Sequence, residues 1–273
     1  MSLKMNESIN LFARARACLS CGDVDEKLDR AAQMHLDWGN GALDTAEIAL
    51  PELVEAGRPQ SPELVHPRNL PRRSFATPEG RLTLIHAVAH IEFNAINLAC
   101  DAVFRFRDMP RGYYDDWVRV TAEEAEHFRL LRERLRAGGC DYGSFAGHNG
   151  LWDMAMRTAH DPLQRMALVP RMLEARGLDV TPAMIDRFTA AGERAVVDVL
   201  SLILREEIGH VAIGSRWFRH ICGERGLEPE QTYFDLLDSF VKGGIRSPLH
   251  REARLKAGFS ESEMARLQRL CGR

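Results

Sequence analysis

Apolar residues recur along most of the chain at the three- and four-residue spacing of an amphipathic helix. Residue types that favour helices, namely Ala, Leu, Arg, Glu and Met, dominate these segments. No Asn-Gly or Asp-Gly turn lies between runs of alternating apolar residues, as a β-hairpin would require. The pattern therefore predicts an all-α protein. Helices are expected at about 6–20, 23–38, 79–107, 111–137, 151–191, 193–223, 229–241 and 260–270.

Local signals predict several helix ends. Asp23, with Glu26 three residues later, is expected to form a capping box for the second helix. Thr77 and Pro78 are expected to start the third helix, and Gly138-Gly139 to end the fourth. Prolines exclude a long helix between residues 50 and 80. They are Pro51, Pro59, Pro62, Pro67, Pro71 and Pro78.

Composition narrows the class of protein. The 273 residues include 36 Lys+Arg and 39 Asp+Glu, a net charge of −3 that excludes a general nucleic-acid coat protein. There is no run of 18 apolar residues and no apolar segment in Met1–Asn10, so we expect a cytoplasmic protein without a membrane span. Six cysteines are too few for a disulfide framework. Cys18 and Cys21 are interpreted as residues of an apolar helix face rather than as a redox or zinc pair.

One motif occurs twice, 83 positions apart. Glu124 and His127 lie in the first copy, and Glu207 and His210 in the second, each reading Glu-Glu-x-x-His. Residues i and i+3 are neighbours on a helix, so each pair can converge on one point. A carboxylate with an imidazole suits iron or manganese. Glu123 and Glu206, four residues before each histidine, are the alternative ligands.

The surroundings of both motifs argue against solvated surface acids. Apolar residues flank each motif at helical spacings, so the motif face should be buried, where an unpaired charge is costly. The flanking residues are Val120, Leu130, Leu131 and Leu135 in one copy and Leu200, Ile203, Leu204 and Val211 in the other.

Two further glutamates extend the repeat. Glu92 precedes Glu124 by 32 positions, and Glu174 precedes Glu207 by 33. Glu92 and Glu124 each lie 16 residues from a turn near Asp108, which places them at one height. Residues 177–182 look like a helix end followed by a new cap. Glu174 and Glu207 can lie at one height only if this segment interrupts a helix without reversing the chain. We therefore expect the chain to reverse near Gly192.

Several stretches resemble an uncharacterised bacterial family of ferritin-like proteins, over roughly residues 20–255. The segment from Gly150 through His160 to Gly177 is the most specific. More distantly, the chain is similar to the tRNA methylthio-isopentenyladenosine hydroxylases, which are non-haem di-iron monooxygenases. The similar stretches are 85–101, 123–135, 150–181 and 205–217.

This resemblance implies a ferritin-like four-helix bundle at residues 79–223. N-terminal helices and a Pro/Arg-rich segment (1–78) precede it, and a C-terminal helical extension (224–273) follows it. It implies two iron ions, with manganese as the alternative metal, and a dioxygen-dependent oxidoreductase or hydroxylase. The substrate would be a small or nucleoside-like molecule, with tRNA suggested only by the distant similarity. The implied metal ligands are Glu92, Glu124, His127, Glu174, Glu207 and His210.

Two other functions stay open at this point. One is an iron-storage or ferroxidase-type protein, and the other is a non-catalytic bundle with a structural metal. His86 and His90 could also bind metal, but His90 lies about 200° around the helix from Glu92, so we expect structural roles. His160 is expected to be a core or interface residue.

Basic residues cluster in segments 66–81 and 242–256. They could bind an anionic substrate, such as a nucleotide or a tRNA phosphate, or could form an ordinary ion-paired surface. The residues are Arg68, Arg72, Arg73 and Arg81 in the first segment and Lys242, Arg246, Arg251, Arg254 and Lys256 in the second.

Overall fold

The computed structural model describes residues 9–52, 55–70, 74–241 and 245–271, and all regular elements within these ranges are helical. The prediction of an all-α protein is confirmed, while the ferritin-like arrangement stays a prediction. By its internal contacts the chain divides into two compact units, Met1–Met156 and Arg157–Arg273. The finer boundaries expected at residues 78 and 223 stay predictions. No helix in the described ranges is long and apolar enough to cross a membrane.

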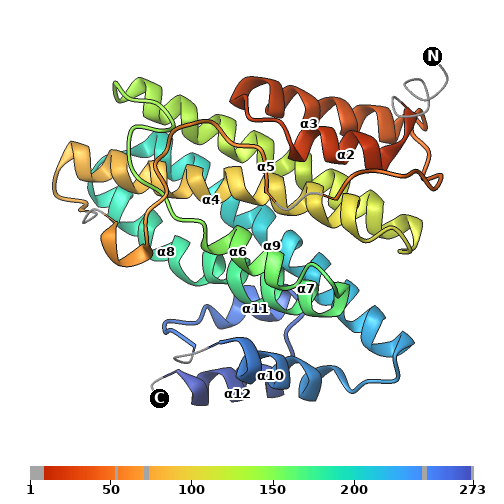
Figure 1. Cartoon of the computed structure of the whole chain (residues 1–273). Helices are drawn as coiled ribbons and strands as arrows, with labels where there is room; N and C mark the ends of the chain where they lie inside the picture. Colours follow the sequence, from red (N-terminus) through yellow and green to blue (C-terminus); the bar gives the residue numbers. More distant parts are fainter. Residues whose placement is uncertain (1–8, 53–54, 71–73, 242–244, 272–273) are drawn as a thin grey trace. The chain divides into compact units, whose positions relative to one another are not determined.

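The N-terminal unit is built on two long helices, α4 (Pro78–Arg105) and α5 (Arg111–Ala137), which pack along each other. Two shorter helices cover them: α2 (Leu11–Leu19) packs on α4, and α3 (Val24–Gly39) packs on α5. A short 3-10 helix (Pro67–Asn69) and α6 (Gly150–Arg157) complete the described helices of this region. Figure 1 shows α2 and α3 in red along the α4–α5 pair.

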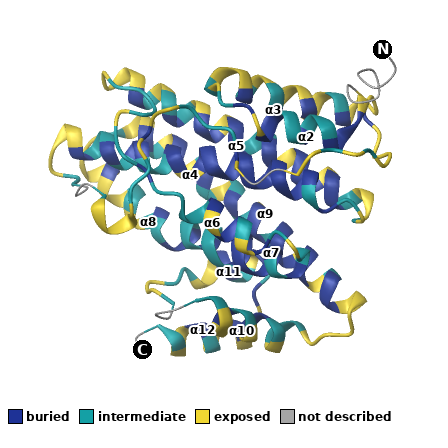
Figure 2. Cartoon of the chain, viewed as in Figure 1, coloured by how far each residue is buried: buried dark blue, intermediate teal, exposed yellow. Residues whose placement is uncertain are grey.

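Helix α4 is buried on all sides over residues 92–104, which appear as a dark blue run in Figure 2. Polar side chains within this run therefore need partners. Asp101 binds Arg105 at 2.7 Å, and Asn97 accepts a hydrogen bond of 2.5 Å from the buried Lys27 ammonium. Burial lowers the pKa of Lys27, whose ammonium also donates to two carbonyls at the end of α2.

The predicted helix ends are largely confirmed. The Asp23 carboxylate accepts from the Glu26 backbone at 2.9 Å, and the Thr77 hydroxyl accepts from the Gly80 backbone at 3.1 Å. The expected capping box is only half formed, because the Glu26 carboxylate binds Arg30 at 2.7 Å instead of the cap backbone. Helix α5 has the expected bounds.

The C-terminal unit centres on α8 (Ala175–Ala190) and α9 (Arg194–Glu224), which pack on each other. The chain reverses between them at Gly192, whose φ of 77° suits glycine, so the predicted turn is confirmed. Helix α7 (Pro162–Leu168) and the π-helical segment η2 (Val169–Glu174) precede α8 and pack on α9. Helices α10 (Pro229–Phe240), α11 (Arg251–Lys256) and α12 (Glu261–Leu270) follow.

The interruption expected at residues 177–182 is wrong. Helix α8 runs through this segment with Pro182 inside it, and the irregularity lies earlier, in η2. Pro170 has no N–H to donate, which favours the wider π-helical turn there. A Cβ at Gly214 of α9 would lie 2.4 Å from the Pro170 ring, so glycine makes this close approach possible. Asp179, within the segment, binds Arg254 through its carboxylate at 2.7 Å.

A buried arginine ties η2 to the C-terminal helices. The Arg171 side chain is fully buried and donates to Glu263 at 2.7 Å and to Ser215 at 3.1 Å. Its guanidinium also lies 4.3 Å from the ring centre of Tyr233 and 4.6 Å from that of Phe259. Arg171 therefore links segments that are far apart in the sequence.

Replacing Arg171 with leucine is expected to lower the free energy of unfolding by about 3 kcal/mol, because it leaves the buried Glu263 carboxylate without its cation. Urea unfolding followed by circular dichroism measures this change. The control is Arg251→Leu, which removes an exposed ion pair with Glu261 and should cost about 0.5 kcal/mol or less. Equal losses in the two variants would contradict the anchoring role of Arg171.

Candidate metal centre

The hairpin of α4 and α5 brings three predicted ligands together in the N-terminal unit. The Nδ1 atom of His127 lies 3.4 Å from Oε2 of Glu92 and 3.4 Å from Oε2 of Glu124. Ligand atoms of all three residues lie within 4.8 Å of one another, and all three side chains are buried. The two glutamates meet because each lies 16 residues from Asp108 in the connection between the helices.

The register of α5 selects one acid from the three in the motif. Glu124 and His127 are buried together with Ala125 and Phe128, whereas Glu126 is exposed and Glu123 is half-buried. Positions i and i+3 lie on one helix face, so Glu124 and His127 project to the same point. The preference for Glu124 over Glu123 agrees with this burial.

The electrostatics of the cluster are those of a group that could hold a cation. Burial disfavours the charged form of His127, but its hydrogen bonding to the Glu124 and Glu92 carboxylates outweighs burial and raises the pKa of His127 to about 11. Burial and the neighbouring Glu124 charge raise the pKa of Glu92 well above its ordinary value. In the metal-free chain, a proton on His127 is thus held between two carboxylates. A metal ion in this position would take over the charge balance.

The C-terminal unit carries the second copy of the motif on α9. Nδ1 of His210 lies 3.2 Å from Oε2 of Glu207, and both residues are buried. Glu206 is only half-buried, which again agrees with the preferred choice. The i, i+3 geometry repeats that of Glu124 and His127.

Glu174 ends the π-helical segment and is half-buried. A Cβ at Gly177, three residues later, would lie 3.8 Å from Cγ of Glu207. Glu174 shares a helix face with Gly177, which places it on the side of α8 that faces Glu207. Within the described ranges, however, Glu174 does not join a group of three ligand residues as tight as that of Glu92, Glu124 and His127.

The donor atoms of the N-terminal group fit a metal ion. Two ligands of one ion at about 2.1 Å lie roughly 3 to 4 Å apart, and the separations of the two carboxylate oxygens from Nδ1 of His127 are 3.4 Å. Carboxylate oxygen with imidazole nitrogen is a donor set that suits iron and manganese. The buried Glu/His group could therefore bind a metal.

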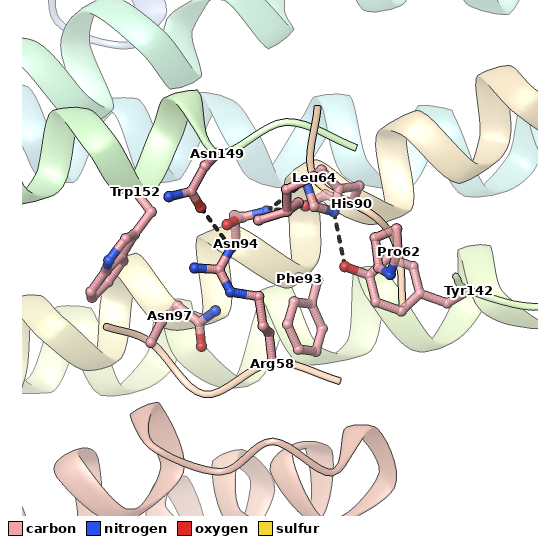
Figure 3. Close-up of a pocket in the computed structure, with 11 residues that line it drawn as sticks. Arg58, Pro62, Leu64, His90, Phe93, Asn94, Asn97, Tyr142, Asn149 and Trp152 are labelled. Atoms are coloured by element: carbon pink, nitrogen blue, oxygen red, sulfur yellow. Dashed lines mark hydrogen bonds between the residues drawn. The ribbon is translucent and has the colours of Figure 1, made fainter. Parts of the chain in front are cut away.

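His86 and His90 have structural roles in the same unit. Nε2 of His86 accepts from the Gly143 backbone at 2.9 Å. The ring of His90 hydrogen-bonds through Nδ1 to the Tyr142 hydroxyl at 2.9 Å (Figure 3). Through Nε2 it also hydrogen-bonds to the His148 carbonyl at 3.0 Å. These contacts hold the segment after α5 against α4, as expected. A Cβ at Gly147 would lie 2.6 Å from His90 Nε2, so glycine at this position allows the backbone to pass close to the ring.

Figure 3 shows a small cavity beside His90, lined by both polar and apolar side chains, that the sequence did not reveal. Its volume is about 10 Å³, enough for one water molecule but not for an organic substrate. Arg58 donates to Asn149 at 2.8 Å on its wall. The available signal was a pair of asparagines, Asn94 and Asn97, one turn apart within an apolar helix.

The remaining candidates divide between surface and core. His160 is exposed, so it is not a core residue.

Most described basic residues of segment 242–256 form ion pairs: Arg251 with Glu261, Lys256 with Glu252, and the buried Arg254 with Asp179. In segment 66–81, Arg68 is exposed and Arg81 donates to the Phe75 carbonyl at 3.1 Å. Arg72, Arg73 and Lys242 lie outside the described residues.

The comparisons with known proteins identify a family without a described activity. The profile of a family described as "Protein of unknown function (DUF455)" matches residues 20–265. An uncharacterized protein of Haemophilus influenzae is 44% identical over 225 residues, which cover 78% of each chain. No solved structure matches the chain at a significant level. The chain therefore belongs to the DUF455 family.

Proposed function

We propose that the chain is a non-haem di-iron protein that uses dioxygen to oxidise or hydroxylate a small organic substrate. The observation that carries the proposal is the buried group of Glu92, Glu124 and His127, whose donor atoms have the spacing of metal ligands. A group of this composition is costly to bury without a cation.

The sequence repeat supports the number of metal ions. Each unit supplies two glutamates and one histidine, so the full proposed set has four carboxylates and two imidazoles. Four negative charges balance two divalent ions. Glu174 is the ligand with the least support, since it is half-buried. The proposed set is Glu92, Glu124, His127, Glu174, Glu207 and His210.

When bound, reduced iron supplies the electrons that dioxygen activation needs. The chain's own residues hold the metal and keep water away from it. Glu92 and Glu124 would bind through their carboxylates, and His127 would bind through Nδ1 after releasing the proton at that atom. Helix α5 surrounds the motif with buried Ala125 and Phe128, which limits access of water.

The proposed substrate is a small or nucleoside-like molecule, and the proposed setting is the cytoplasm. Recognition of tRNA rests only on the distant similarity to the tRNA hydroxylases. Manganese is the alternative to iron, because both ions accept the same donor set.

Metal analysis of the purified chain tests the ligand assignment. We expect about two iron ions per chain in wild-type protein. Glu124→Gln and His210→Ala should each weaken metal binding by more than about 100-fold, because the loss of a metal ligand costs more affinity than the loss of a residue that hydrogen-bonds to a ligand. The measurement is metal content by mass spectrometry after dialysis against a weak chelator.

The matched controls are Glu126→Gln and His220→Ala, which change exposed or half-exposed positions on the same two helices. They should retain wild-type metal content. Wild-type protein grown with abundant iron that contains no transition metal would refute the assignment.

Oxygen consumption separates catalysis from the two other functions. The iron-loaded chain, reduced chemically and mixed with oxygenated buffer, is expected to consume dioxygen in an amount set by its two iron ions. An oxygen electrode measures this. No consumption by metal-loaded protein would indicate a structural metal, and uptake of many iron ions per chain would indicate storage.

Metal binding is expected to release protons. The pKa of His127 is about 11 in the metal-free chain, so its imidazole is protonated at neutral pH, whereas a ligating imidazole must be neutral. The apparent affinity for Mn²⁺, a redox-stable probe, should therefore rise from about pH 6 to about pH 8. Calorimetry in two buffers of different ionisation enthalpy measures the protons released. Binding without proton release would contradict the prediction.

A further inference from the structure

The C-terminal unit contains a second site that the proposed metal chemistry does not use. A cavity of about 410 Å³ lies between the η2–α8 segment, α10 and α12. This volume is within the usual range for small-molecule sites. Its apolar wall includes Met172, Leu173, Tyr233 and Leu267, with Val241 and Ile245 at the loop side.

Positive charge dominates the polar part of the lining. Three arginines, Arg176, Arg246 and Arg254, face one carboxylate, that of Asp179. Arg254 binds both oxygens of Asp179, at 2.9 and 2.7 Å, and Arg176 approaches the same carboxylate at 3.5 Å. One negative charge cannot balance three guanidinium groups, so the described lining residues carry two excess positive charges.

The arginines are fixed to different degrees. Arg176 donates to the backbone carbonyls of Arg246 at 2.9 Å, Ser247 at 3.2 Å and Pro248 at 2.8 Å, which holds the loop against α8. The Arg246 side chain is exposed at the rim, and it forms no ion pair with an acid of the described chain. It is therefore available for an anion that enters the cavity.

The site is separate from the predicted metal ligands. Met172, Arg176 and Asp179 follow one another at intervals of four and three residues, so they occupy one face of the helix. Glu174 follows Met172 by two residues in the π-helical turn, which puts it on the opposite face of the segment, together with Gly177. Binding in the cavity therefore needs no metal.

We propose that this cavity binds an organic oxyanion, a carboxylate or phosphate group carried on an apolar body. The guanidinium groups of Arg246 and Arg176 would receive the oxyanion, since arginine donates paired charge-assisted hydrogen bonds to such groups. The side chains of Met172, Tyr233 and Leu267 would contact the apolar body. This assigns a role to Arg246. Among the described arginines and lysines of segment 242–256, it is the one that forms no ion pair.

Calorimetry on the full chain tests the proposal, with metal-loaded and metal-depleted protein in parallel. The probes are decanoate and acetate for a carboxylate, and decyl phosphate and inorganic phosphate for a phosphate. We expect one long-chain probe to bind at one site per chain, more tightly than its short counterpart. The pair that binds identifies the anionic group.

Arg246→Glu is expected to weaken this binding at least about tenfold, since it replaces a charge-assisted donor with a like charge. The matched control is Arg269→Glu, the same charge change at an exposed arginine of α12 that does not line the cavity. Circular dichroism confirms that both variants are folded.

The proposal is overturned if neither long-chain probe gives saturable binding at millimolar concentration. It is also overturned if Arg246→Glu binds as the wild type does, or if both variants lose affinity equally. Equal binding by metal-loaded and metal-depleted protein is expected, so the result does not depend on the di-iron proposal.

Discussion

The packing of α4 against α5 encloses two carboxylates and one imidazole, and their charges must balance there because water is excluded. In the metal-free chain a proton on His127 offsets one carboxylate charge, because the nearby glutamates raise the pKa of the imidazole to about 11 despite burial, and the raised pKa of Glu92 favours its neutral form. The same constraint makes the cluster receptive to a metal cation. Helix α4, buried over a long central run, accommodates Glu92 because its carboxyl group faces the His127 imidazole of α5.

Buried cations organise the C-terminal unit in a comparable way. Arg171 joins η2 to α9, α10 and α12, and Arg254 joins α11 to α8 through Asp179. Both arginines satisfy a carboxylate and lie over aromatic rings, so their charge is compensated and their stems contribute to packing. The C-terminal helices are thus held to α8 and α9 by specific polar contacts as well as by apolar area.

The η2–α8 segment serves two chemical environments. One face carries Glu174 and Gly177 toward Glu207 on α9, and the other carries Met172, Arg176 and Asp179 along the cationic cavity. Pro170 gives this segment its π-helical turn, and Gly214 makes room for the proline ring. The change from π-helix to α-helix between η2 and α8 sets which residues lie on each face of the segment. One segment therefore carries both the candidate ligand Glu174 and residues that line the candidate anion site.

The candidate residues were recognisable because their spacing is local. Glu124 and His127 share a helix face by periodicity, and equal arm lengths around Asp108 set Glu92 level with them. The turn at Gly192 could likewise be predicted from arm lengths. The continuity of α8 through residues 177–182 could not, because Gly177 and Pro182 have the local pattern of a helix end and a new helix start.

The sequence by itself determined the helical class, most helix ends and the Glu-x-x-His pairs, since each depends on residues a few positions apart. Only the tertiary structure decided the burial of Lys27 and Arg171, the roles of His86 and His90, and the cavity beside Arg246. Those features depend on contacts between residues distant in the chain, whose free energy no local pattern of side chains encodes.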